Sequence, residues 1–159
     1  MKDQSNQSRL VRVPSTAIER GLELVAQIAL GIEMALLYLR FAPLRDATSP
    51  ATLAGLFSLV AFSAILYVAL SFARRLPIAS LPQISRIRES NIDSYARLLR
   101  TFIAFLKAFS LVLLGVSEWM WIQVALGASE AFAWVLLLVG VVLIIGAFLA
   151  FFSAVKRLT

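Results

Sequence analysis

Long apolar blocks make up most of the chain, and short polar segments separate them. The blocks cover about residues 20–41, 53–73, 99–126 and 132–155, and each is long enough to cross the hydrocarbon core of a bilayer as a helix. Apolar residues follow one another within the blocks instead of alternating with polar ones, which is typical of segments surrounded by lipid. The pattern predicts an all-α integral membrane protein whose four transmembrane helices form an antiparallel up-down bundle.

Local signals mark several helix ends. Thr16 and Glu19 have the Thr-x-x-Glu spacing of a capping box, which predicts the start of the first helix. Pro43 and the charged residues around it predict the end of this helix near residue 41. Pro50 suits the first turn of the second helix, because the N–H that proline lacks would be unpaired there in any case.

The length of the chain limits its domain organisation. Four spans and their connections nearly fill the 159 residues, so we expect a polar tail over residues 1–15 and a single transmembrane domain over residues 16–157. Hydrophobic residues make up 60% of the chain and charged residues only 15%, which is well below the usual charged fraction of a soluble domain. No separate soluble domain is predicted.

Positive charge predicts the orientation in the membrane. Residues 74–98 carry five arginines, whereas the opposite side carries only Arg40 and Arg45. The positive-inside rule therefore places residues 74–98 and both termini in the cytoplasm. We interpret residues 74–98 as a basic loop leading into an extended third helix, with an amphipathic helix along the headgroups as the alternative. Cations near the membrane surface can bind lipid headgroups, and the candidates are Arg74, Arg75, Arg86, Arg88, Arg97 and Arg100.

The chain contains neither cysteine nor histidine. This removes disulfides, thiolate zinc sites and the commonest axial ligand of haem, so neither haem nor zinc is expected. No cofactor can be identified from the sequence, and bound lipid is the expected ligand. The net charge of +6 is explained by the cations that flank the spans, and no nucleic-acid recognition motif accompanies it.

Glu33 and Glu118 lie inside apolar blocks, where a carboxylate is costly unless it faces a protein interior or a wet cavity. Glu33 is near the middle of its span, and Glu118 is about five residues beyond the middle of its own, or roughly 7–8 Å. Arg40 follows Glu33 by seven residues and Lys107 precedes Glu118 by eleven, so each acid shares a helix face with a cation. These residues, with Tyr67, form the predicted intramembrane polar site for a proton or an ion. Glu23, nearer the cytoplasm, is expected to pair with Arg20 or to reach Lys107.

Small residues recur every seven positions in the fourth span. Such a stripe lets helix backbones approach closely, either within the bundle or against another protein. The predicted packing seam consists of Ala133, Gly140, Ala147 and Ala154. In the second span Ser63, Tyr67 and Ser71 share one face, which predicts hydrogen bonds to neighbouring helices.

The sequence contains no catalytic or nucleotide-binding motif. We therefore favour a non-catalytic accessory subunit that stabilises a larger membrane complex through helix packing and buried Glu pairs. The alternative is a small proton- or cation-coupled transporter that uses Glu33 and Glu118, and a second alternative is a membrane-embedded lipid-modifying enzyme. The expected partners are the lipid bilayer and either other membrane subunits or a second copy of the chain. The expected location is the cytoplasmic (inner) membrane of a bacterium or archaeon.

Overall fold

The computed structural model describes residues 15–74, 91–127 and 131–158. Within these ranges the chain is all helical, and the helices are α2 (Ala17–Ala47), α3 (Pro50–Ala73), α4 (Ile92–Ala125) and α5 (Ala131–Lys156). Each of them has a stretch long and apolar enough to cross a membrane. The prediction of a helical membrane protein is confirmed to this extent.

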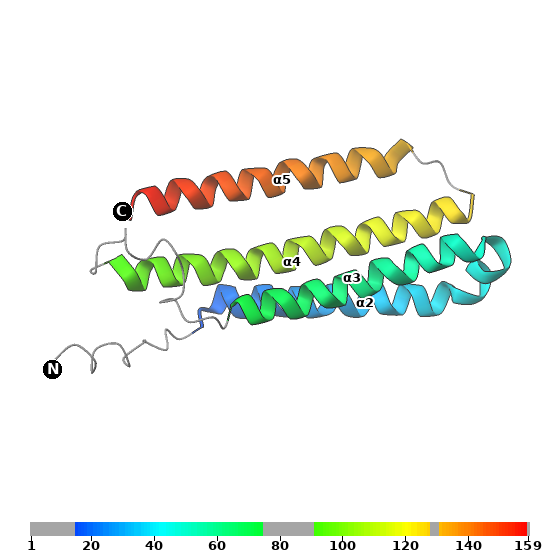
Figure 1. The fold of residues 1–159 in the computed structure, drawn as a ribbon, viewed down its shortest axis with the longest axis horizontal. Coiled ribbons are helices and arrows are strands. Elements are labelled where there is room, and N and C mark those ends of the chain that lie inside the picture. The colour runs from blue at the N-terminus through cyan, green and yellow to red at the C-terminus, as the bar shows by residue number, and fades with distance from the viewer. Residues whose placement is uncertain (1–14, 75–90, 128–130, 159) are drawn as a thin grey trace.

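The helices lie side by side along a common long axis (Figure 1). Helices α2, α3 and α4 pack against one another, and α5 packs against α4. Hydrogen bonds join helix ends that are far apart in the sequence: Arg74 contacts Glu19, and the Asn91 side chain donates to the Leu158 carbonyl at 2.9 Å. We call this end of the molecule, where α2 and α4 begin and α3 and α5 finish, the Arg74 end.

Helix α2 begins where the capping signal predicts but ends later than expected. The Thr16 hydroxyl accepts a hydrogen bond from the Glu19 N–H at 3.2 Å. The predicted end near residue 41 is wrong, because α2 continues through Pro43 to Ala47. A proline removes one intrahelical donor and crowds the preceding turn, but Leu44 in the next position is fully buried and anchors the continued helix.

Helix α3 begins as predicted, with Pro50 in its first turn and the Ser49 hydroxyl accepting from the Thr52 N–H at 3.3 Å. Helix α4 begins at Ile92, earlier than the predicted residue 99, in agreement with the interpretation of an extended third helix. Residues 75–90, which carry most of the predicted basic loop, lie outside the described residues.

Two apolar layers fill the interior between α2, α3 and α4. The layer nearer the Arg74 end, which we call the inner layer, consists of Ala26, Ala29, Ala108 and Leu111. The layer nearer the opposite end, which we call the outer layer, consists of Leu37, Leu44, Leu56 and Ile122. The space between these layers is where the interior of the bundle becomes polar.

Helix α5 is held against α4 by a glycine and by aromatic rings. A Cβ at Gly140 would overlap the Leu113 side chain, at 2.7 Å from Cδ2, so the glycine permits the close approach of the two helices. Phe102 of α4 stacks on Phe151 of α5, with ring centroids 4.2 Å apart. Gly140, a member of the predicted seam, therefore packs within the chain.

The other residues of the predicted packing seam are not exposed in the described part of the structure. Ala147 and Ala154 are half-buried, and the side chain of Ala133 is outside the described part of the structure. The described seam residues thus leave no exposed stripe of small side chains on α5. This matters for function, since an exposed seam would have indicated a surface for a partner subunit.

Candidate functional site

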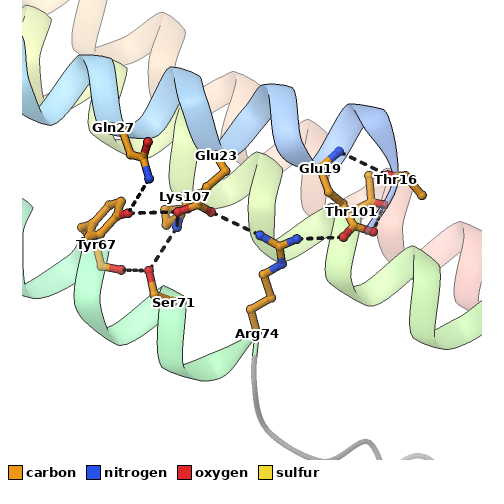
Figure 2. A network of polar contacts seen from close by, with 9 residues as sticks. All are labelled: Thr16, Glu19, Glu23, Gln27, Tyr67, Ser71, Arg74, Thr101 and Lys107. Carbon is orange, nitrogen blue, oxygen red and sulfur yellow. Dashed lines mark hydrogen bonds and ion pairs between the residues drawn. The ribbon is translucent and has the colours of Figure 1, made fainter. Parts of the chain in front are cut away.

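A network of ion pairs occupies the Arg74 end of the bundle interior (Figure 2). The Arg74 guanidinium donates to Glu19 Oε2 at 2.9 Å and to Glu23 Oε2 at 3.3 Å, so it joins α3 to two successive turns of α2. The Thr101 hydroxyl of α4 lies 3.5 Å from Glu19 Oε1. Glu19 is 1% exposed, and its carboxylate is therefore bound by the protein instead of by solvent.

Lys107 of α4 is the second cation of this network and is 1% exposed. Its ammonium group donates to Glu23 Oε1 at 2.5 Å and to the Ser71 hydroxyl at 3.0 Å. The Tyr67 hydroxyl also donates to Glu23 Oε1, at 3.0 Å, and accepts from the Gln27 amide at 3.3 Å. The network therefore holds two carboxylates and two cations, and their charges balance.

These contacts settle two of the sequence-based predictions. The expectation that Tyr67 and Ser71 bond to neighbouring helices is confirmed. Of the two carboxylates considered as partners of Lys107, the structure shows Glu23 and not Glu118. Lys107 and Glu118 share a stripe of α4, but eleven residues separate them by about 16 Å along the helix.

Arg40 is also not the counter-charge of Glu33. It is exposed near the end of α2 and lies about 10 Å along the helix from Glu33, whereas Glu33 is completely buried. Seven-residue spacing puts the two side chains on similar faces, but it does not bring their charges together.

The predicted headgroup-binding arginines divide into three groups. Arg74 is engaged in the interior network with Glu19 and Glu23. Arg97 is exposed and Arg100 is half-buried, and both can still lie near the membrane surface. Outside the described residues lie Arg75, Arg86 and Arg88.

A second polar cluster lies between the two apolar layers and contains Glu33 of α2, Ser63 of α3 and Glu118 of α4. All three side chains are 0% exposed. None of their five side-chain oxygens has a hydrogen-bond partner among the described residues. Glu33 and Glu118 are close enough to interact electrostatically, and Ser63 is the polar neighbour of Glu33. We call these three residues the acid-pair site.

The apolar layers isolate the acid-pair site along the bundle. Ala29 of the inner layer and Leu37 of the outer layer lie one turn on either side of Glu33, and Ile122 lies one turn beyond Glu118. Glu23 is ten residues from Glu33, or about 15 Å along α2. The acid-pair site is therefore separated from the cations of the network by packed hydrocarbon.

Gly115 provides the space for the Glu33 side chain. A Cβ at Gly115 would lie 3.1 Å from Glu33 Cγ and 3.3 Å from Oε1. A larger residue at this position would require the Glu33 side chain to shift by a few tenths of an ångström, so glycine favours this close approach of α4. The site is thus assembled from three helices, with Gly115 as part of its wall.

Sequence reasoning identified the two acids but missed their neighbours. Ser63 was predicted to form an interhelical hydrogen bond, and helical spacing placed it on the correct face without indicating that it faces Glu33. Gly115 has no distinguishing local pattern, and its role depends on the distance between α2 and α4, which no single helix encodes.

The acid-pair site can bind a positive charge. Two ionised carboxylates in a dry interior would repel each other and would lack compensation for their lost hydration. Among the described residues no cation reaches them, so charge neutrality requires protons or a bound cation. Carboxylate and hydroxyl oxygens are suitable ligands for either.

Comparisons of the chain with protein families, with curated proteins and with solved structures found no match.

Proposed function

We propose that this protein is a small membrane transporter in which Glu33, Glu118 and Ser63 bind the coupling proton or monovalent cation. The proposal includes an antiparallel up-down bundle in the cytoplasmic membrane of a bacterium or archaeon, with both termini and the Arg74 end facing the cytoplasm. The observation that carries it is the pair of fully buried carboxylates without a hydrogen-bond partner or a counter-ion among the described residues. Intramembrane carboxylates of this kind are typical of ion and proton pathways.

The interior network at the Arg74 end supports different roles for the two polar clusters, one structural and one functional. Its carboxylates are matched by Arg74 and Lys107 and join α2, α3 and α4. A satisfied network of this kind stabilises the helix arrangement and leaves the acid-pair site free to exchange its ion. In this proposal the network fixes the scaffold and the acid-pair site performs the function.

The alternative of an accessory subunit is supported by the same network, because it consists of buried Glu pairs of the kind such a subunit would use. Two observations favour transport instead. Glu33 and Glu118 are not part of the network, and Gly140 of the predicted partner seam packs against α4. The lipid-modifying alternative has less support, since Arg74, one of the arginines predicted to bind lipid headgroups, is engaged with Glu19 and Glu23.

The proposal is tested by reconstitution of the purified protein into liposomes that contain a pH-sensitive dye. We expect a gradient of sodium, potassium or an organic cation to change the internal pH, with the effective cation identifying the coupled ion or solute. Glu33→Gln keeps the shape of the side chain but removes its charge, so this variant should lose the pH change.

The matched control is Asp46→Asn, which neutralises an exposed carboxylate at the end of α2. This control should transport like the unmodified protein. Unchanged flux in Glu33→Gln would contradict the role assigned to Glu33.

A further inference from the structure

An apolar groove runs between α2 and α4 on the outer surface of the bundle. Its volume is about 460 Å³, and its lining includes Ile28, Ala29, Ile32, Val112, Gly115 and Trp119. Ile28, Ile32 and Trp119 are each about half exposed, so the groove opens sideways from the bundle. In a membrane this opening faces lipid and not water.

Gly115 belongs both to this groove and to the wall of the acid-pair site. One side of the residue lines the groove. The position that a Cβ would occupy lies 3.3 Å from Glu33 Oε1. The groove and the uncompensated carboxyl group are therefore separated at this point by a residue that has no side chain.

We propose that this groove admits a lipophilic organic cation from the membrane, whose charge is neutralised by Glu33 and Glu118 while its apolar groups lie between α2 and α4. The inference rests on the proposed transport function and names the class of its solute. The occupant is chosen by charge complementarity, because an apolar groove beside two acids without a counter-ion favours a molecule that is both apolar and cationic.

Other occupants fit less well. A lipophilic anion would be repelled by the acids, and a neutral lipid would gain nothing from them. Small hydrated inorganic cations would lose their water in a groove whose lining is apolar. Trp119 at the edge of the groove can also attract an organic cation through its ring face.

Binding of the cation is balanced by release of a proton. The O–H bond of a protonated carboxyl group breaks, the proton passes to solvent, and the resulting carboxylate pairs with the cation. Facing the acid pair, α3 contributes Ser63, which does not titrate in this range. Among the described residues, the charged groups nearest along the helices are Arg40, which is exposed about 10 Å along α2 from Glu33, and Glu23 and Lys107, which lie beyond the inner layer.

The test uses tetraphenylphosphonium and tetraphenylborate, which have the same shape and opposite charge. Calorimetry of the purified full-length protein in a mild detergent should detect binding of tetraphenylphosphonium, with weaker binding at lower pH. A weakly buffered solution should record a proton release when the cation binds. Tetraphenylborate should give neither signal. Equal binding of the two ions would overturn the inference, because it would reflect partition into an apolar surface.

Variants locate the binding site. Glu33→Gln and Glu118→Gln should each weaken tetraphenylphosphonium binding at least about tenfold, corresponding to about 1.4 kcal/mol, and abolish the proton release. Gly115→Val should weaken tetraphenylphosphonium binding, because the valine side chain would occupy the space between the groove and the carboxyl group of Glu33. The matched control is Gly146→Val on α5, where an added Cβ meets nothing within 4 Å. Equal loss in both glycine variants would contradict the location.

The result of the tetraphenylphosphonium test can be distinguished from the result of the liposome transport test. If tetraphenylphosphonium does not bind but Glu33-dependent flux of protons or inorganic cations remains, the lipophilic-cation inference is wrong and the proposed function stands. The pH dependence of tetraphenylphosphonium binding is measured on the unmodified protein, so this test does not require any variant to fold. If that binding is independent of pH, the proposed exchange of cation for proton is wrong.

Discussion

Replacing Lys107 with methionine should lower the free energy of unfolding by about 3–5 kcal/mol. Lys107 is nearly completely buried and provides the shortest ion pair to Glu23. Its removal leaves Glu23 Oε1 with only the Tyr67 hydroxyl, and the Ser71 hydroxyl loses a donor. Unfolding of the purified protein in mixed micelles, followed by circular dichroism, measures the change.

Two comparisons identify the cause of this loss. Arg45→Met removes a cation that also contacts a carboxylate, that of Asp46, but both side chains are largely exposed, so the cost should be no more than about 1 kcal/mol. Adding Glu23→Gln to Lys107→Met should cost less than the sum of the two single changes, because the partners act together. If the two changes are additive, the contact between Lys107 and Glu23 does not stabilise the fold.

Replacing Glu118 with methionine should have the opposite effect and raise the free energy of unfolding by about 1–3 kcal/mol. Glu118 is fully buried, and neither of its carboxylate oxygens has a partner among the described residues. Methionine has a similar shape and removes the cost of burying these polar atoms. The same micelle unfolding assay measures the gain, and liposome assays should show the loss of pH-coupled flux.

Glu19→Met is the matched control, because Glu19 is an equally buried glutamate with partners. This change removes the acceptor of Arg74 and should destabilise the protein. Opposite signs for the two variants would support a functional acid-pair site and a structural network. If Glu118→Met is as destabilising as Glu19→Met, Glu118 has a structural role and the accessory-subunit alternative gains support.

The properties of single helices were predictable from the sequence. Hydrophobic length predicted four membrane-spanning segments, Thr16 and Pro50 marked helix starts, and helical spacing placed Tyr67 and Ser71 on an interhelical face. Each of these features belongs to a single helix, and the signals for helix starts and faces depend on residues within about one or two turns of each other. These features therefore do not depend on how the neighbouring helices are arranged.

The contacts between helices were less predictable. The sequence left Glu118 and Glu23 open as partners of Lys107, and Lys107 pairs with Glu23 because α2 presents that carboxylate at the same level. The same applies to Arg40, which shares a face with Glu33 but lies exposed near the helix end. Helical spacing fixes direction around an axis, whereas partner choice also depends on how neighbouring helices are rotated and shifted.

Infrared spectroscopy of the lipid-reconstituted protein, in buffer free of alkali cations, tests most directly whether Glu33 and Glu118 hold an exchangeable positive charge. We expect a carbonyl band of a protonated carboxylic acid at neutral pH. This band should weaken when tetraphenylphosphonium or another coupled cation is added, and it should be lost or shifted in Glu33→Gln and Glu118→Gln. A spectrum without the band, or with a band that neither substitution changes, would show that Glu33 and Glu118 do not hold an exchangeable proton.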